Sequence, residues 1–231
     1  EKDKTCVVFS EQVDKEIELE KNILKPFLFG SDIKKYGGPQ TKIRILFPYE
    51  IVGDRVNLIP IEKLKKEYPL SFEYLSSVKL ILMNRKIDHA ANDFYKYSAA
   101  RSLIEYNQTK IMIPDILVEN RITIDLNGSF YHGPAIHSIV FNEKVKNYNP
   151  LFFLGIFNSK LFWFYLTQTS TALRGNAYRL IPQFLEPFPI KLINFNDPSE
   201  KAIHDKLVSL VDRMLELHKK KNSLPPSAER E

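Results

Sequence analysis

Asp32 and Asp115 are the acidic residues whose sequence contexts best fit metal chemistry. Asp32 lies two residues before Lys34 in "SDIKKY", and Asp115 follows a proline in "IPDILVE". A metal-dependent nuclease needs such carboxylates to hold its cation, with a lysine nearby. Here these residues occur in the wrong order along the chain, and an acid two residues before a lysine is common by chance. A turn or cap role for Asp32 is the simpler interpretation, and a self-contained metal nuclease remains an alternative.

Histidine and cysteine give little support for a metal site or a nucleophile. His132 and His137 flank a Gly-Pro turn and could be ligands, but a surface or hydrogen-bonding role is favoured for both. The one cysteine, Cys6, excludes an intrachain disulfide and a cysteine-rich zinc site. The sequence has no glycine-rich phosphate loop and no Gly-x-Ser-x-Gly elbow. We therefore expect no metal, no cofactor and no catalytic residue in this chain.

Positive charge mixed with aromatic, glycine and asparagine residues is the remaining chemical feature. The formal net charge is +5, and the basic clusters are "DIKKYGGPQTKIR", "NRK" (84–86), "YKYSAARS" and "LRGNAYR". Lysine and arginine suit phosphate contacts, and arginine and asparagine suit base edges. A charge of this size fits an ordinary solvated surface equally well, so charge alone leaves both interpretations open.

The middle of the chain is predicted to be mostly sheet. Short β-rich segments alternate with turn residues, and Asn127-Gly128 is a strong hairpin turn signal leading into "SFYHG". A helix is predicted over 69–86 with Ser71 as its N-cap. The predicted strands are 42–50, 55–60, 110–116, 121–126 and 135–142, and the first two are expected to pair across a turn at Gly53 and Asp54.

The run "LFFLGIFNSKLFWFYL" (151–166) is the most apolar segment of the chain. It is shorter than the ~20 residues of a bilayer-spanning helix, and Lys160 would lie near its centre. Its periodicity predicts one helix buried on two sides. Asn158, Ser159 and Lys160 would then form a narrow stripe that hydrogen-bonds to the sheet or to backbone. The following segment, 174–190, contains a glycine and three prolines and is predicted to break the helical pattern.

A long C-terminal helix is predicted to begin after Asp197, which can cap it ahead of Pro198 and Glu200. Its apolar residues form one seam of the coiled-coil kind, which needs a partner surface. That surface could be its own domain, another helix of a parent protein or a second subunit. A protein-interaction module is therefore an alternative to nucleic-acid binding and to a metal nuclease. The seam residues are Ile203, Leu207, Leu210, Met214 and Leu217.

Six segments occur in an order that resembles the TaqI-like C-terminal specificity domain, the target recognition domain of adenine-specific DNA methyltransferases and fused type II restriction-modification enzymes. They are "LKPFLFGSDIKKYG" (24–37), "YLSSVKLILMNRK" (74–86), "FYKYSAARS" (94–102), "TKIMIPDI" (109–116), "LFFLGIFNSKLFWFYL" (151–166) and "RGNAYRLIPQFLEPFPI" (174–190). Where members of that family often have a Trp-Tyr pair before an arginine, this chain has Phe94-Tyr95, with Arg101 in place.

The resemblance implies an α+β fold with an irregular, β-helix-like mixed sheet region followed by C-terminal helices. It also implies a division of labour, in which this domain reads double-stranded DNA and an N-terminal methyltransferase domain of the same polypeptide performs N6-adenine methylation with S-adenosylmethionine. The chain does not begin with Met and contains no Asn-Pro-Pro sequence, so we expect it to be a non-catalytic part of a longer enzyme. The resemblance further implies a prokaryotic, cytoplasmic enzyme that is not attached to a membrane.

Two further expectations concern organisation and contacts. Residues 1–195 are expected to form the recognition domain, and 196–231 a helix and tail that pack on it or on a partner. DNA contacts are assigned from predicted exposure and not from the resemblance, because residues that read different sequences must differ between relatives. The predicted contacts are Lys34, Lys35, Arg85, Lys86, Arg174, Asn176 and Arg179, with His132 and His137 as weaker base-edge candidates.

Overall fold

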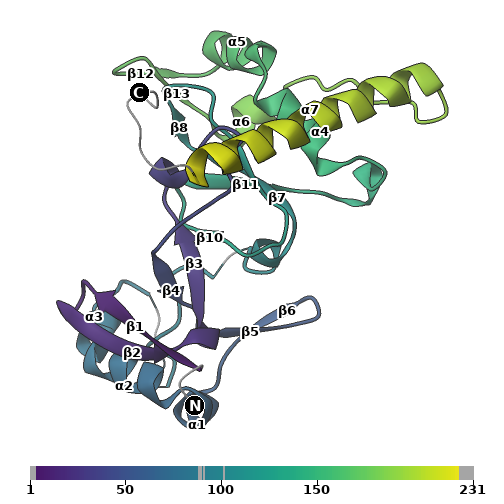
Figure 1. Ribbon diagram of the computed structural model, residues 1–231. Coiled ribbons are helices and arrows are strands. Elements are labelled where there is room, and N and C mark those ends of the chain that lie inside the picture. The colour runs from purple at the N-terminus through teal and green to yellow at the C-terminus, as the bar shows by residue number, and fades with distance from the viewer. Residues whose placement is uncertain (1–3, 88–89, 91, 101, 224–231) are drawn as a thin grey trace. The chain divides into compact units, whose positions relative to one another are not determined.

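The computed structural model describes residues 4–87, 90, 92–100 and 102–223 (Figure 1). The chain forms two compact units and passes between them more than once. Unit 1 comprises Glu1–Phe27 and Lys42–Asn107, and unit 2 comprises Leu28–Thr41 and Gln108–Glu231. Helices and several small antiparallel sheets occur together, which confirms the predicted α+β class.

Unit 1 packs short hairpins and helices around one small core. Strands β1 and β2 pair as an antiparallel hairpin, as do β5 and β6, and β3 pairs with β4. The predicted turn at Gly53 and Asp54 joins β5 to β6, with Gly53 at φ 57°. The elements are β1 (Thr5–Ser10), β2 (Lys15–Glu20), η1 (Lys21–Ile23), β3 (Leu24–Leu28), β4 (Arg44–Leu46), β5 (Tyr49–Val52), β6 (Arg55–Leu58), α1 (Ile61–Glu67), α2 (Pro69–Ser77), α3 (Lys79–Met83) and η3 (Glu105–Asn107).

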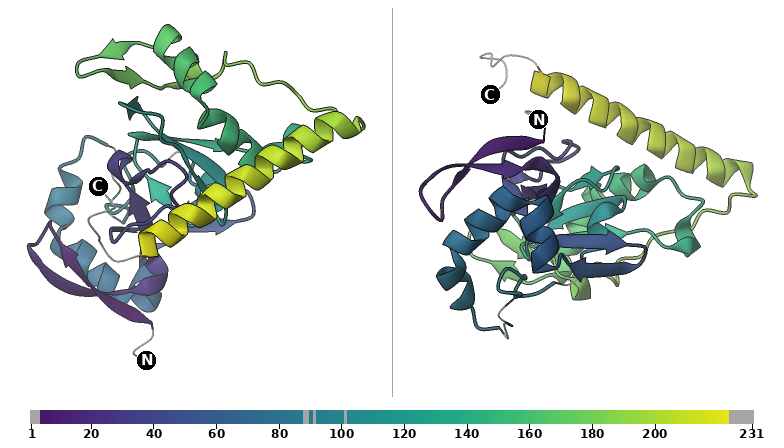
Figure 2. Two further views of the ribbon diagram at one scale, coloured as in Figure 1. Left: turned by 45° about the horizontal axis from the view of Figure 1, so that its top comes forward. Right: turned by 90° about the horizontal axis from the view of Figure 1, so that it is seen from below.

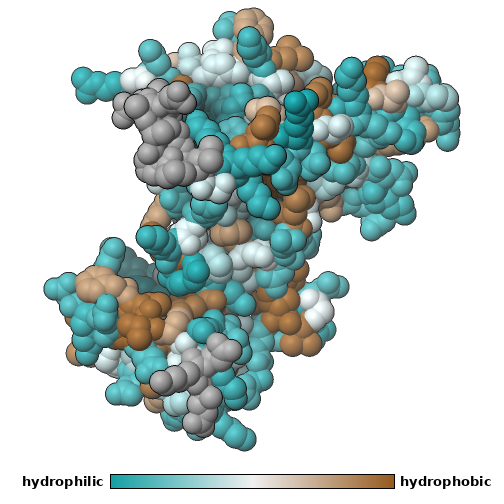
Figure 3. Space-filling view, in the orientation of Figure 1, coloured by the Kyte–Doolittle hydropathy of each residue, from teal (hydrophilic) through white to brown (hydrophobic). Residues whose placement is uncertain are grey.

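The core of unit 1 includes both residues of the Phe94-Tyr95 pair. Phe94 is 2% exposed and Tyr95 3%, and the hydroxyl of Tyr95 donates to the carbonyl of Ile59 at 2.6 Å. Apolar side chains also gather on the surface of unit 1 near the β1–β2 hairpin (Figure 3), where Val7 and Phe9 are exposed. Arg101, noted with the Phe94-Tyr95 pair, lies outside the described residues.

The helix predicted over 69–86 is two helices, α2 and α3, which meet at Val78. Ser71 is not its N-cap, because Ser71 is a buried residue inside α2. The cap comes from Glu20 in β2, whose carboxylate accepts the backbone N–H groups of Leu70 and Ser71 at 2.9 and 3.0 Å and the hydroxyl of Ser71 at 2.5 Å. A carboxylate at a helix N-terminus satisfies free donors and complements the helix dipole, so this cap fixes the hairpin to α2.

Unit 2 contains two three-stranded sheets and the apolar C-terminal half of the chain. Strand β7 is the central strand of the first sheet, between β11 and β9, and every one of its residues is buried. Strand β13 is central in the second, between β12 and β8. The elements are η2 (Gly30–Asp32), β7 (Lys110–Pro114), β8 (Ile116–Leu117), β9 (Thr123–Asp125), β10 (Tyr131–His132), β11 (Ile136–Val140), η4 (Glu143–Val145), α4 (Pro150–Phe157), α5 (Lys160–Thr169), β12 (Ala172–Leu173), β13 (Ala177–Arg179), α6 (Pro182–Leu185) and α7 (Pro198–Ser223).

The Asn127-Gly128 turn follows β9 as predicted, with Gly128 at φ 61°, but β9 pairs with β7. The strand predicted over 135–142 is β11, and it pairs with β7 on the other side. A turn signal reports a local change of direction, whereas strand pairing depends on which surfaces can be buried together.

The apolar run 151–166 forms two helices, α4 and α5, where one was predicted. Asn158 ends α4, and its side chain bonds both backbone groups of Ile122, at 3.1 Å to the N–H and 2.9 Å to the carbonyl. Ser159 begins α5 by accepting the N–H of Phe162 at 3.1 Å. The predicted hydrogen bonding to backbone is therefore confirmed for Asn158, while Lys160 is exposed. Within the described residues, no helix is long and apolar enough to cross a membrane.

Helix α7 is the long yellow-green helix in Figures 1 and 2, and it packs on α4 of the same unit. Asp197 caps it, accepting the N–H of Ser199 at 2.8 Å, as predicted. Gly155 of α4 lets the two helices approach closely, because a Cβ there would lie 2.8 Å from Val211. The buried residues of α7 are His204 and Val211. Of the five predicted seam residues, Leu207 packs beside Gly155 of α4. The other four are 37% to 62% exposed, so the seam as a whole does not pack on this unit: Ile203, Leu210, Met214 and Leu217.

Candidate nucleic-acid interface

The β12–β13 hairpin presents two of the predicted contact residues at its tip. Leu173 pairs with Ala177, so residues 174–176 form the turn, and all three are exposed. Gly175 has φ 79° and Asn176 φ 56°, two successive left-handed conformations that glycine and asparagine adopt at least cost. The "RGN" sequence therefore forms the turn and places Arg174 and Asn176 in solvent.

The hairpin is attached to unit 2 along its second strand. Tyr178 and Arg179 pair with Leu117 and Ile116 of β8, and the N–H of Leu180 donates to the carbonyl of Asp115 at 2.7 Å. The ring of Tyr178 also packs edge-on against Trp163 of α5, with centroids 5.6 Å apart. Backbone pairing and aromatic packing thus fix the base of the hairpin, while its tip extends into solvent.

Asp115, His137 and Arg179 come together where β8, β11 and β13 approach one another. Asp115 Oδ1 lies 3.8 Å from Arg179 Nε and 3.7 Å from His137 Nε2. Both distances are too long for hydrogen bonds, although they allow electrostatic attraction. Among the described residues, Asp115 Oδ1 and His137 Nε2 are buried atoms without a hydrogen-bond partner. Buried polar atoms normally have partners, so this cluster has unused capacity for donors and acceptors from a ligand.

His132, the other predicted histidine, has both ring nitrogens engaged. Nδ1 donates to the carbonyl of Gly133 at 2.9 Å, and the Ser138 hydroxyl donates to Nε2 at 2.6 Å. Burial lowers the pKa of His132, because the surroundings disfavour the charged ring. The hydrogen-bonding role is confirmed, and a contact with a base edge would require one of these bonds to be exchanged.

Lys34 and Lys35 are exposed on the loop that follows η2 in unit 2. Asp32, in the same segment, accepts the N–H of Phe29 at 2.8 Å, which confirms the predicted cap role. No group of three or more His, Cys, Asp and Glu residues that could hold a metal ion occurs among the residues that the structure describes.

Arg85 and Lys86 belong to unit 1. The guanidinium of Arg85 donates from Nε to the carbonyl of Leu82 at 2.8 Å and from Nη2 to the carbonyl of Phe94 at 2.7 Å. It therefore closes α3 and ties the helix to the segment containing Phe94, whereas Lys86 is exposed. Seven of the nine predicted contact residues are in unit 2: Lys34, Lys35, His132, His137, Arg174, Asn176 and Arg179.

Sequence reasoning missed two features of this surface. Asp115 was considered only as a metal ligand, and its place beside Arg179 depends on the pairing of β13 with β8. His218, Lys221 and Asn222, in the last turns of α7, lie with Lys34 and Lys35 around one hollow. The run of lysines at positions 219–221, near the end of α7, was the available signal.

Comparison with known proteins identifies one family and one relative. Residues 25–190 match the family described as the TaqI-like C-terminal specificity domain. Over 207 residues the chain is 27% identical to the type II restriction enzyme and methyltransferase RM.Eco57I of Escherichia coli. That alignment covers 84% of this chain and 21% of the relative, so the chain spans about a fifth of the relative's length.

Proposed function

The chain belongs to the TaqI-like C-terminal specificity domain family, and from this premise we propose that it reads a short base sequence in duplex DNA through the β12–β13 hairpin. The recognition role itself follows from membership of a family of specificity domains and from the similarity to a restriction-modification enzyme. Our proposal adds which surface performs it and which side chains take part.

The tip of the hairpin carries the observation that supports this proposal most directly. A two-stranded ribbon is narrow enough to enter the major groove, where each base pair presents a distinct pattern of donors and acceptors. Arg174 and Asn176 are exposed at the turn, and their side chains suit guanine and adenine edges respectively. Each such pair discriminates against a wrong base by about 1–3 kcal/mol.

Arg179 and His137 would extend the reading surface to the base of the hairpin. The Asp115 carboxylate attracts Arg179 without a hydrogen bond, at 3.8 Å, so it orients the guanidinium and leaves its donors available. His137 Nε2 is near the same carboxylate and has no partner within the described part of the chain. We assign Asp115 as a positioning residue and Arg179 as a base contact, with His137 contributing only through the exposed part of its ring, because its Nε2 is buried.

In the whole enzyme, this domain would hold the duplex while an N-terminal methyltransferase domain modifies an adenine. The relative is named as a restriction enzyme and methyltransferase. Methylation of the adenine amino group requires the base to leave the helical stack, which is easiest when a separate domain clamps the flanking duplex. S-adenosylmethionine would bind in that other domain, and the residues of this chain would bind and orient DNA.

The test compares the full chain with its Arg174→Ala/Arg179→Ala variant on a randomised duplex library and then on the enriched site. The double variant should bind the enriched site more weakly and should relax base preference at the contacted positions. It should also reduce the salt dependence by about one unit for each phosphate that is no longer neutralised. Lys160→Ala is the matched control, because Lys160 is an exposed cation on α5 that is not among the assigned contacts. Unchanged affinity, preference and salt slope in the double variant would refute the assignment.

Two further assays separate the alternatives. Incubation of the complete polypeptide with duplex DNA and labelled S-adenosylmethionine, without magnesium, should transfer methyl groups to adenine at the same enriched site. Magnesium-dependent cutting by this chain alone would favour the nuclease alternative. Association with a protein partner and no affinity for DNA would favour the interaction module.

A further inference from the structure

A hollow of about 580 Å³ lies on unit 2 between the loop after η2 and the C-terminal end of α7. In Figure 1 that end of α7 lies beside the purple segment containing the loop. The residues around the hollow are cationic or are neutral hydrogen-bonding residues, with one acidic exception, Asp32. Its main polar lining residues are Lys34, Lys35, Gln40, His218, Lys221 and Asn222.

The charge around this hollow is not neutralised by the protein. Lys34, Lys35 and Lys221 have no carboxylate partner within the described residues. Asp32 Oδ2 accepts the N–H of Phe29, and its charge offsets one of the three lysines, so the lining keeps a net positive charge. A helix end attracts lysines through its dipole, which accounts for Lys221. The dipole does not account for two lysines on a separate loop facing the same space.

The loop is held in place by contacts that leave its lysines free. Arg121 Nη1 donates to the carbonyls of Gly30 and Ile33 at 2.7 and 3.0 Å, and the Thr123 hydroxyl donates to the carbonyl of Gly37. Gly37 packs so closely that a Cβ there would lie 2.7 Å from the Cβ of Lys34. Fixing the backbone before a ligand arrives reduces the entropy lost on binding. The loop thus has the properties of a preorganised site.

Tyr36 connects the loop to the helix. Its ring centroid lies 6.3 Å from that of His218, and Lys35 Nζ lies 5.9 Å from the Tyr36 ring. Burial raises the pKa of Tyr36, so the phenol stays neutral and adds no negative charge to the hollow. The aromatic pair keeps the end of α7 beside the loop lysines.

We propose that this hollow binds phosphodiester groups of the duplex read by the hairpin, so that the last turns of α7 form a backbone clamp. The inference rests on the proposed function. Lysine ammonium groups and amide N–H donors are the groups that bind phosphate without reading sequence. His218, Lys221 and Asn222 lie beyond residues 25–190. The clamp would therefore add contacts to DNA phosphates from outside the region that matches the family.

The experiment measures affinity of the full chain for its enriched duplex across a range of salt concentrations. Lys35→Ala/Lys221→Ala should lower the slope of log affinity against log salt by about two units, since each phosphate contact contributes about 0.9. Relative affinities for different base sequences should not change, because phosphates carry no sequence information. The matched control is Lys160→Ala/Lys206→Ala, which removes two exposed lysines, one of them about 22 Å along α7 from Lys221.

The outcomes separate this inference from the function beneath it. An unchanged salt slope in Lys35→Ala/Lys221→Ala, with a folded protein by circular dichroism, overturns the clamp even if the wild type reads sequence. A reduced slope together with a wild type that has no base preference supports the clamp and overturns sequence reading by the hairpin. Inorganic phosphate and ATP serve as competitors. If the double variant loses their binding while its DNA salt slope is unchanged, the hollow is a small-anion site and the clamp is refuted.

Discussion

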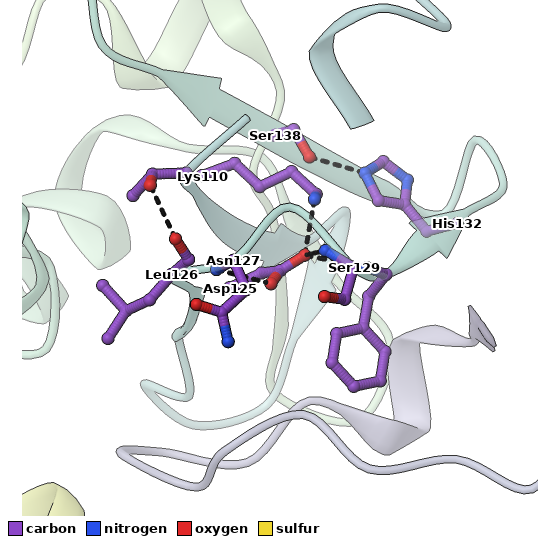
Figure 4. A network of polar contacts seen from close by, with 9 residues as sticks. Lys110, Asp125, Leu126, Asn127, Ser129, His132 and Ser138 are labelled. Atoms are coloured by element: carbon purple, nitrogen blue, oxygen red, sulfur yellow. Dashed lines mark hydrogen bonds and ion pairs between the residues drawn. The ribbon is translucent and has the colours of Figure 1, made fainter. Parts of the chain in front are cut away.

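Two aspartates of unit 2, Asp125 and Asp115, have surroundings that are opposite in kind. Asp125, at the end of β9, is 3% exposed and lies 2.6 Å from the ammonium of Lys110, which is fully buried (Figure 4). Its Oδ2 also accepts the N–H groups of Ser129 and Phe130, both at 2.8 Å. Every strong contact available to this carboxylate is used inside the protein.

Asp115 has the same charge and a comparable set of neighbours, yet its Oδ1 makes no hydrogen bond with any described residue. Its neighbours His137 and Arg179 lie at 3.7 and 3.8 Å, and Arg179 is on the exposed edge of the hairpin. The comparison shows how one residue type serves two purposes. A carboxylate surrounded by donors closes a turn, whereas a carboxylate that only attracts its neighbours can position them for another molecule.

The largest expected effect is a loss of stability when the Asp125 carboxylate is removed. Asp125→Ala would remove the carboxylate that pairs with the buried Lys110 ammonium and that accepts three backbone N–H groups after β9. Breaking a buried pair on one side costs about 3–5 kcal/mol, so the free energy of unfolding measured in urea should fall by that amount. Lys110→Met/Asp125→Leu is the informative partner, since removing both charges should recover part of the loss. Equal destabilisation by both variants would contradict the ion-pair explanation.

Arg179→Ala should have the opposite effect, lowering DNA affinity while leaving the free energy of unfolding almost unchanged. DNA affinity at the enriched site should fall by about 1–3 kcal/mol, with relaxed preference at one base position. The unfolding free energy should change by no more than about 0.5 kcal/mol, because the side chain is exposed and makes no short ion pair. Urea denaturation and equilibrium binding on the same preparations measure both. A loss of stability without a loss of affinity would make Arg179 a structural residue like Lys110.

Asp115→Asn should give a smaller effect in the same direction. The amide keeps the size of the carboxylate but loses the charge that attracts Arg179 and His137. Affinity should fall by about 0.2–1 kcal/mol, the usual range for a partly exposed ion pair. Because Asp115 acts through Arg179, the substitution should have little effect in an Arg179→Ala background. This double-mutant cycle distinguishes positioning from direct DNA contact, since a direct contact would give additive losses.

The sequence predicted features that depend on neighbouring residues. The exposed turn at Arg174 and Asn176 follows from a local "RGN" signal, and the β5–β6 turn and the start of α7 follow from equally local rules. Features that depend on distant segments were missed. Glu20 caps a helix 50 residues away, and Asn158 divides an apolar run because it bonds Ile122, 36 residues earlier.

The candidate site divides in the same way. Exposure of the hairpin tip was predictable, but the meeting of Asp115 with His137 and Arg179 requires two sheets to form in a particular register. The hollow requires α7 to pack on α4 through Val211 and Leu207, with Ile203 exposed. The apolar period predicted one continuous seam, of which only Leu207 lies at this contact. Periodicity identifies a helix reliably, but selecting the buried face needs the shape of the surface it meets.

The smallest expected effect is a pH dependence of the free energy of unfolding, which arises from His132 in the region around Asp125. Burial lowers the pKa of His132 below 6.5, so the unfolded chain binds more protons than the folded chain between 6.5 and the lower folded value. The stability contributed by neutral His132 is therefore present above pH 6.5 and is lost as the pH falls through that window. Urea midpoints measured between pH 7 and 5 should show this loss of stability in the wild type and not in His132→Gln. The control variant His218→Gln should show the same loss as the wild type. An unaltered slope in His132→Gln would mean that burial does not hold the His132 ring neutral, and would weaken the contrast between the Asp125 and Asp115 regions.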